Sequence, residues 1–384
     1  MVRIHQRAPL PHPLSIHLRP IATACLLALA TFILYSLELR REPVGPEEAQ
    51  LISAAQQLPK GVPPLLVNIS GNRWVQPLGF YATTISHAIA PGFFAGRRAS
   101  IFVASVNVAL IFLVAWRVFR RYLPALGAAL ILMFTPAHFA FGRVGIDAIY
   151  VIPFILIWLY AVLEFVDKDR PAAIAVAAAA LGAGVYSAPS APLTMMFLWI
   201  TMMVALWVAR RRKLSTLLIA AGTFVATLIP LMVWFYLHPA TYQDTYGRWA
   251  IFAAHLRNPV DGFRASVNTN TLGTRASTYW SLIDPSYLFF SRAGTTAPLL
   301  MVSAPLMVAG IIRCVRLVRN TAALLVLVGV VVAPLAGSSF GERNYIALAL
   351  GLLPFAALLA AYGVEEVREI IVGRPQPASE ESTE

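Results

Sequence analysis

The sequence predicts an all-α membrane protein, a polytopic bundle of about ten transmembrane helices. Of its 384 residues, 58% are apolar and only 12% are charged, whereas about a quarter of the residues of a soluble domain are charged. The apolar residues gather in blocks of about 20, the length that an α-helix needs to cross a bilayer. The blocks are apolar throughout, which argues against lipid-spanning strands because those alternate in polarity.

Charged residues lie almost entirely between the apolar blocks. Several blocks are slightly short or contain a proline, so nine to eleven spans are compatible with the pattern. Block 20–39 is expected to be a retained anchor, and block 171–187, almost all Ala and Gly, is expected to be buried among other helices. The blocks are 20–39, 98–119, 122–141, 147–166, 171–187, 191–209, 214–237, 296–312, 320–338 and 345–362.

Basic residues distinguish the two sides of the predicted bundle. Twelve Lys and Arg residues crowd into four short gaps, whereas Arg143 and Arg343 are the only ones in the short gaps that alternate with these. Short cytoplasmic loops are the ones enriched in Lys and Arg, so both termini are expected in the cytoplasm, with the chain in a bacterial inner or plasma membrane. The net charge of +12 then reflects topology and attraction to anionic lipids, and we expect no nucleic-acid partner. The four basic gaps are Arg117 to Arg121, Lys168 to Arg170, Arg210 to Lys213 and Arg313 to Arg319.

One domain is expected over residues 1–366, followed by a polar cytoplasmic tail over 367–384 that we expect to be disordered. Two outward loops, 40–97 and 238–295, are long. In the first, a helix is expected to begin at Pro46, because Pro suits the first helical position and acids suit the first turn. Leu51, Ile52, Ala55 and Leu58 form an apolar stripe at helical spacing. Trp74 to Ala90 is also amphipathic, so both segments are expected to lie on the membrane surface.

Acidic residues fall at two places on the non-cytoplasmic side. Glu47 and Glu48 could stabilise the start of a helix or could be functional. Asp147 lies among apolar residues at the edge of a span, where a carboxylate is costly without a partner. It could pair with Arg143 four residues earlier or act in chemistry, and the sequence leaves both alternatives open. The histidines and the two cysteines lack ligand spacing, so no metal site is expected.

The order of these features resembles the GT-C class of polytopic glycosyltransferases, which includes the family 39-like protein O-mannosyltransferases and the aminoarabinose transferases. After one span, that class has an acidic pair on a loop helix and then a Pro-Leu-x-x-Tyr stretch. An Arg begins the second span, and the third span ends with a Pro-His motif and an Arg followed by Asp. An Arg-Tyr pattern precedes the last span. The matching residues here are Pro46-Glu47-Glu48-Ala49, Pro77-Leu78-Gly79-Phe80-Tyr81, Arg97 or Arg98, Pro136-Ala137-His138, Arg143 with Asp147, and Arg343 with Tyr345.

The resemblance implies an inverting enzyme that moves a sugar from a polyprenyl phosphate to an acceptor on the non-cytoplasmic face. It implies a lipid-linked sugar and membrane lipids as partners, no fixed cofactor, and room for a divalent cation as in some relatives. Glu47 would be the base that activates the acceptor, and Arg343 would hold the leaving phosphate. The full set of implied residues is Glu47, Glu48 and Asp147 for catalysis, and Arg143, Arg343, Tyr81, His138 and Arg292, with Arg275 as a weaker candidate, for substrate binding.

Two features depart from the class. Glu47 stands where the class usually has Asp, and the chain is shorter than many members. These departures favour an alternative function, that of a catalytically inactive GT-C-like scaffold or accessory subunit with protein partners and a pocket that is filled or lacks convergent charge. A transporter is a third alternative, but inverted repeats and paired broken helices, the usual pointers to one, are not evident in the sequence.

Overall fold

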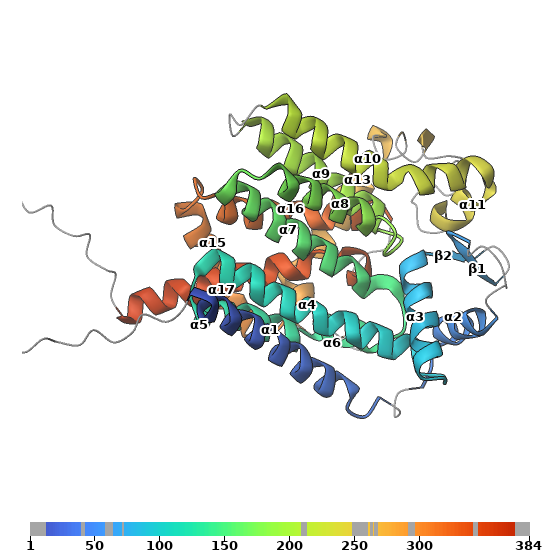
Figure 1. Cartoon of the computed structure of the whole chain (residues 1–384), viewed down its shortest axis with the longest axis horizontal. Coiled ribbons are helices and arrows are strands. Elements are labelled where there is room, and N and C mark those ends of the chain that lie inside the picture. The colour runs from blue at the N-terminus through green and yellow to red at the C-terminus, as the bar shows by residue number, and fades with distance from the viewer. Residues whose placement is uncertain are drawn as a thin grey trace, which may run out of the picture.

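The computed structural model describes residues 13–39, 43–57, 64–70, 73–208, 213–247, 260–261, 264, 268–290, 296–340 and 345–372. Within these ranges the chain is a helical bundle with one short β-ribbon (Figure 1). The all-α membrane fold expected from the sequence is therefore confirmed. Arg292, Arg343, Leu58 of the expected apolar stripe and residues 373–384 of the expected tail lie outside the described residues.

The long helices coincide with the predicted apolar blocks. Five of them are long and apolar enough to cross a membrane alone, and the bent pair α5–α6 would make a sixth span. The protein is thus an integral, multi-pass membrane protein, although a count of ten spans is not confirmed. The helices of the bundle are α1 (Pro13–Ser36), α4 (Ala95–Phe119), α5 (Tyr122–Phe134), α6 (Pro136–Arg143), α7 (Val151–Lys168), α8 (Pro171–Gly184), α9 (Ala191–Val208), α10 (Leu214–Leu237), α15 (Ser303–Arg316), α16 (Thr321–Ser338) and α17 (Leu352–Val372).

The bend between α5 and α6 measures 56° and follows from Pro136, which has no N–H to donate and breaks the helix. Backbone groups freed inside a membrane need new partners. The Tyr35 hydroxyl of α1 donates to the Met133 carbonyl at 2.6 Å, and the Ala137 N–H donates to the Pro298 carbonyl at 3.1 Å. His138 Nδ1 lies 2.8 Å from the same hydroxyl. The two contacts of Tyr35 tie α1 to the bent span, and the Ala137 bond joins this span to the segment before α15.

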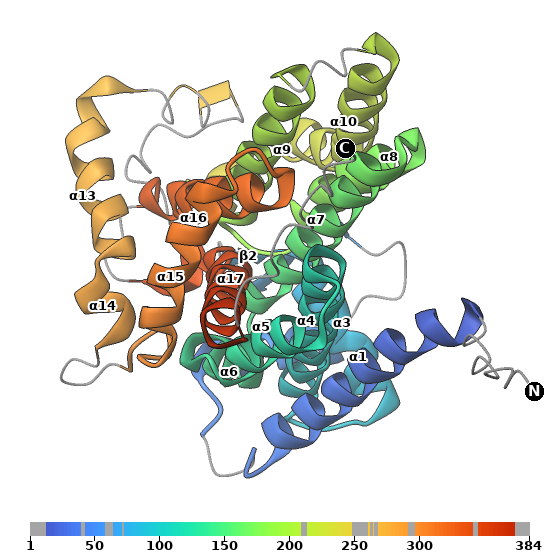
Figure 2. The same ribbon diagram turned by 90° about the vertical axis from the view of Figure 1, so that its left-hand side faces the viewer.

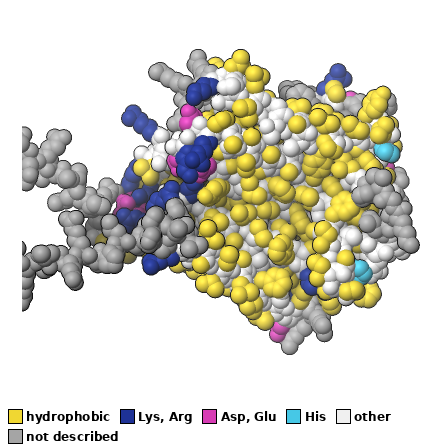
Figure 3. Space-filling view, in the orientation of Figure 1, with side chains coloured by type: hydrophobic (Ala, Val, Ile, Leu, Met, Phe, Trp, Pro, Cys, Tyr) yellow, Lys and Arg dark blue, Asp and Glu magenta, His cyan; other side chains and the backbone are white. Residues whose placement is uncertain are grey.

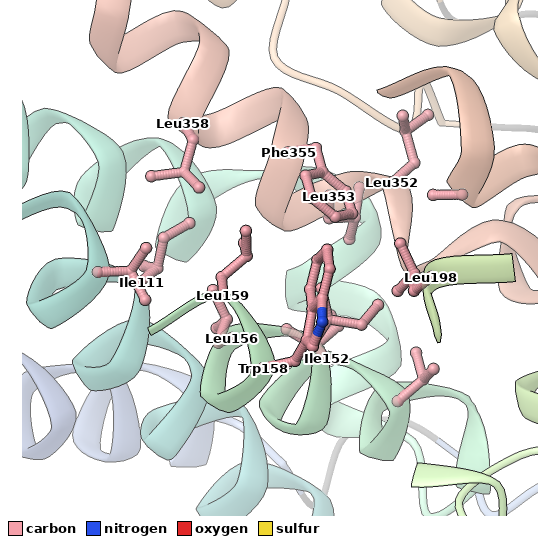
Figure 4. Packing of buried hydrophobic residues seen from close by; sticks show 14 of the residues in the cluster. Ile111, Ile152, Leu156, Trp158, Leu159, Leu198, Leu352, Leu353, Phe355 and Leu358 are labelled. Atoms are coloured by element: carbon pink, nitrogen blue, oxygen red, sulfur yellow. The ribbon is translucent and has the colours of Figure 1, made fainter. Parts of the chain in front are cut away.

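The core is centred on α7, which packs against α4, α8 and α17. Trp158 of α7 is fully buried and faces Leu353 and Phe355 of α17 (Figure 4). The Ala-rich α8 packs closely on α7 and α10, as the sequence predicted. A Cβ at Gly182 of α8 would lie only 1.6 Å from the Thr227 hydroxyl of α10, so this helix contact requires glycine.

The two ends of the bundle differ in charge. At one end, ion pairs link Arg117 to Glu164 at 2.6 Å and Arg313 to Glu366 at 2.9 Å, and Figure 3 shows charged side chains gathered there beside a broad apolar surface. The opposite end carries α2 (Pro46–Gln56), the antiparallel ribbon of β1 (Val67–Ser70) and β2 (Arg73–Val75), α3 (Pro77–Ile89), α11 (Ala240–Tyr242) and the following π-helix η2 (Gln243–Gly247) (Figure 1).

The first long loop contains two helices, as expected, but α3 begins at Pro77 because Trp74 belongs to a ribbon that was not predicted. In the second long loop, α13 (Leu272–Ile283), preceded by the 3-10 turn η4 (Thr269–Thr271), and α14 (Pro285–Phe289) form a layer beside α15 and α16 (Figure 2). Helix α17 continues to Val372, so the first six residues of the expected polar tail are helical.

Candidate active site

Helix α2 presents two acidic residues in opposite ways. Pro46 occupies its first position, and Glu47 and Glu48 lie in its first turn, as the sequence predicted. Leu51, Ile52 and Ala55 of the predicted apolar stripe are buried, and the helix packs against α3. Glu48 points inward with them and is only 1% exposed. Glu47, one residue earlier, lines a pocket at this end of the bundle.

Arg97 of α4 binds the Glu48 carboxylate through a paired, charge-assisted contact. Arg97 Nε donates to Glu48 Oε1 at 2.7 Å, and Nη2 donates to Oε2 at 2.9 Å. The guanidinium also donates to the carbonyls of Leu39 at 3.0 Å and Pro43 at 2.8 Å. Both side chains are 2% exposed. Bidentate Arg–carboxylate pairs add geometric specificity, so this clamp sets how α2 and the segment before it sit on α4.

The clamp also reaches the segment that carries Asp147. The Gly145 N–H donates to Glu48 Oε1 at 3.0 Å. A Cβ at Gly145 would lie 2.9 Å from that oxygen and 3.1 Å from the backbone nitrogen of Arg97. A Cβ at Gly96 would lie 3.3 Å from Gly145 Cα. The absence of side chains at both glycines therefore permits this close approach. The chain then enters the 3-10 turn η1 (Asp147–Tyr150), which leads into α7.

Glu47 and Asp147, which are one hundred positions apart in the sequence, line the same pocket. Helix α3 packs tightly beside Asp147, since a Cβ at Gly79 would lie 3.2 Å from Asp147 Cβ. The pocket has a volume of about 70 Å³, enough for several water molecules or part of a sugar. Its described lining consists of Glu47, Trp74, Val75, Ile146, Asp147, Ala148, Ala188, Pro189, Ser190, Asp244, Thr245, Tyr345, Ala347 and Leu348, the last two belonging to the 3-10 turn η5 (Ile346–Ala349).

The other described residues proposed from the sequence, Arg143, His138, Tyr81 and Arg275, do not line the pocket. Arg143 ends α6, is buried, and places its guanidinium 4.8 Å from the centre of the Phe139 ring. Val144 to Ile146 leave the helical conformation, so Arg143 and Asp147 do not share one helix. His138 is fully buried beside Tyr35. The Tyr81 hydroxyl donates to the Pro64 carbonyl, and burial raises the pKa of this phenol, so it remains a neutral donor.

Three residues of the candidate site were not found by sequence reasoning. Trp74 and Asp244 line the pocket but belong to no motif, and only their places in the two long loops could have suggested them. Arg97 had been matched only to the start of a span, whereas it is the ion-pair partner of Glu48. For Arg343, the structure describes only its neighbour Tyr345, which lines the pocket.

Among the described residues, no group of three or more His, Cys, Asp or Glu side chains is arranged to hold a metal ion. Glu47, Asp147 and Asp244 share the pocket but do not form such a group.

Comparison with known proteins connects this geometry to a fold class. Residues 75–236 match the family described as dolichyl-phosphate-mannose-protein mannosyltransferase. None of the curated proteins matches the chain. The structure is similar to the crystal structure of ArnT from Cupriavidus metallidurans bound to undecaprenyl phosphate, with a TM-score of 0.57 and 16% identity over 92% of this chain and 60% of that one.

The apo form of the same ArnT gives a TM-score of 0.57 and 17% identity over 91% of this chain and 59% of that one. The chain thus spans about 60% of the length of the solved structures that it resembles. At 16–17% identity, this structural similarity establishes the fold alone. The chain therefore has the fold of the GT-C class of membrane glycosyltransferases, as its resemblance to that class implied.

Proposed function

We propose that the protein is an integral-membrane glycosyltransferase that transfers a sugar from a polyprenyl-phosphate donor to an acceptor on the non-cytoplasmic face. The observation that carries this proposal is the presence of Glu47 and Asp147 in one pocket. The bound lipid in the similar ArnT structure, undecaprenyl phosphate, supports the donor class. An inactive scaffold was expected to have a filled pocket or no convergent charge, so the pocket favours the enzyme.

The side of the membrane follows from the ends of the helices. Helix α4 (Ala95–Phe119) carries Arg97 near its start, close to the pocket, and Arg117 near its end, while α7 begins beside Asp147 and ends at Lys168. The pocket and the basic clusters therefore lie at opposite ends of the same helices. Since basic residues mark the cytoplasmic side, the pocket faces away from the cytoplasm. Both termini lie in the cytoplasm.

In the proposed reaction, the Glu47 carboxylate accepts the proton of an acceptor hydroxyl. That oxygen attacks the anomeric carbon of the sugar, the bond from this carbon to the phosphate oxygen breaks, and the polyprenyl phosphate leaves with both bonding electrons. One displacement inverts the configuration at the sugar. A positioned base contributes typically 10²–10⁴-fold to the rate, and Asp147 orients the acceptor beside it.

Two further groups of residues support this reaction. Glu48 is a positioning residue, because its carboxylate is engaged by Arg97 and Gly145. The departing phosphate needs cations, and Arg binds phosphate through paired hydrogen bonds. Arg343, two positions before the pocket-lining Tyr345, is the first candidate for this task, and Arg292 is the second.

A transfer assay in proteoliposomes, with radiolabelled sugar on undecaprenyl phosphate, tests the proposal. Glu47→Gln is expected to lower kcat by about 10²–10⁴-fold, and Glu47→Asp to lower it less, because the base remains but is displaced. Asp169→Asn is the matched control, since Asp169 pairs with Lys213 at the opposite end of the bundle. Transfer by Glu47→Gln at the wild-type rate would show that Glu47 is not the base.

The orientation is tested by cysteine labelling in a variant without Cys25 and Cys314. A membrane-impermeant maleimide added to intact cells should label Glu47→Cys and should not label Lys213→Cys. The reverse pattern would place the pocket on the cytoplasmic side.

A further inference from the structure

Two pocket residues outside the proposed catalytic pair come from elements that contact each other. Trp74 belongs to β2 and Asp244 belongs to the π-helix η2, and the two elements are packed together. Both residues line the pocket with Glu47 and Asp147. The first and second long loops therefore each contribute a side chain to the same cavity, and the reaction proposed above uses neither of them.

The Trp74 side chain is supported by its strand and by neighbouring aromatic rings. Its strand pairs with β1 through Asn68, and its ring lies edge-to-face with the ring of Trp234 of α10, with centroids 6.3 Å apart. Trp234 in turn stacks on His238, with centroids 4.3 Å apart. An aromatic side chain supported in this way offers a fixed apolar surface to the pocket, and aromatic rings contribute much of the contact energy in binding sites.

The charge of the pocket indicates which part of a lipid-linked sugar fits there. Three carboxylates line it, and none of its described lining residues is basic. A phosphate would be repelled by these carboxylates. A sugar suits them better, because ionised carboxylates act only as hydrogen-bond acceptors and sugar hydroxyls can donate to them. A sugar ring also has an apolar C–H face that can pack against an aromatic ring.

We propose that Trp74 and Asp244 form the subsite that binds the transferred sugar. The ring of Trp74 packs against the C–H face of the sugar, and the Asp244 carboxylate accepts hydrogen bonds from its hydroxyl groups. This inference rests on the proposed function and specifies which part of the donor occupies the pocket. The phosphate then lies outside the carboxylate-lined cavity.

The test compares donors and variants in the proteoliposome assay. Undecaprenyl phosphate carrying a hexose, a pentose or an aminopentose identifies the best donor, and mono-deoxy analogues of that donor follow. Asp244→Asn and Trp74→Leu are expected to lower kcat/KM for the donor by about tenfold or more, since a single missing methylene contact in a pocket costs roughly 10–200-fold and an unpaired buried polar group in a site costs more. Trp74→Phe should retain part of the activity because it keeps an aromatic ring.

Discrimination between donors separates binding from a structural role. The wild type should reject the analogue that lacks the hydroxyl bound by Asp244, and Asp244→Asn, which keeps only one acceptor oxygen and gains an N–H donor, should discriminate less between the two donors. Trp280→Leu and Asp169→Asn are controls, because Trp280 is exposed on α13 and neither residue lines the pocket. Unchanged KM and unchanged discrimination in Asp244→Asn and Trp74→Leu would overturn the proposal.

A binding measurement distinguishes failure of this inference from failure of the proposed function. If the wild type transfers no sugar from any donor, the proposed function fails and the subsite is judged by thermal stabilisation alone. Greater stabilisation by the lipid-linked sugar than by undecaprenyl phosphate, lost in Asp244→Asn and Trp74→Leu, would support the subsite. Equal stabilisation by the two lipids would overturn it.

Discussion

Removing Arg97 should destabilise the end of the bundle that carries the pocket. In Arg97→Met, the Glu48 carboxylate would remain 1% exposed without the cation that contacts both its oxygens. Breaking a buried ion pair on one side costs about 3–5 kcal/mol, because a buried charge is left uncompensated. Arg97→Met also removes the donors to Leu39 and Pro43, so the loss should lie at the upper end of this range. Glu48→Leu together with Arg97→Met should be less damaging than the sum of the two single changes.

Thermal unfolding in lipid nanodiscs and hydrogen exchange of α2 would measure this effect. Arg97→Met should lower the unfolding temperature and speed amide exchange in Pro46–Gln56, since local opening follows the stability of the contacts that hold an element. Lys213→Met is the control: its ion pair with Asp169 is exposed, and such pairs contribute about 0–1 kcal/mol. Stability equal to the wild type in Arg97→Met, or strictly additive effects in the double variant, would refute the stabilising role of the Arg97–Glu48 ion pair.

Three other substitutions test the packing of the helical bundle. Gly145→Ala should destabilise the fold by about 1–3 kcal/mol through overpacking, because its Cβ would lie 2.9 Å from a Glu48 oxygen. Calorimetry should show this loss of stability, and it should show none for Gly222→Ala, whose Cβ would meet nothing within 4 Å. Tyr35→Phe should lower the stability by about 1–3 kcal/mol, since it leaves the Met133 carbonyl at the α5–α6 bend without its hydroxyl donor. A chemical-denaturation midpoint equal to that of the wild type would show that this hydrogen bond does not stabilise the bend. Gly310→Ala should separate α15 from α17, because its Cβ would lie 1.9 Å from a backbone carbonyl of α17; a disulfide engineered across this contact should form more slowly in the variant.

The membrane fold could be predicted because its signals are local in the sequence. Apolar block length defined the spans, and the alternation of basic gaps suggested the sides. The helix at Pro46 was predicted from its first turn and its apolar stripe. The β-ribbon of Val67–Ser70 and Arg73–Val75 was not, because two strands of three or four residues have too little alternation to be recognised.

The candidate site could be predicted only in part. Resemblance drew attention to Glu47, Glu48 and Asp147, and the structure brings Glu47 and Asp147 to one pocket. It could not reveal that Glu48 is engaged by Arg97, because which of two neighbouring side chains points inward depends on tertiary packing. Asp244 was missed for a similar reason, since nothing local marks it and only the fold brings the second long loop over the first.

The most direct test of the account is a double-mutant cycle of sugar transfer with Glu47→Gln, Asp147→Asn and the double variant. Residues that act as a unit in one reaction have strongly non-additive effects on kcat. We expect each single change to lower kcat by at least about 10²-fold, and the double variant to be scarcely slower than the slower single variant. A double variant slowed by the full product of the two single effects, or single variants with wild-type rates, would contradict a shared catalytic pocket.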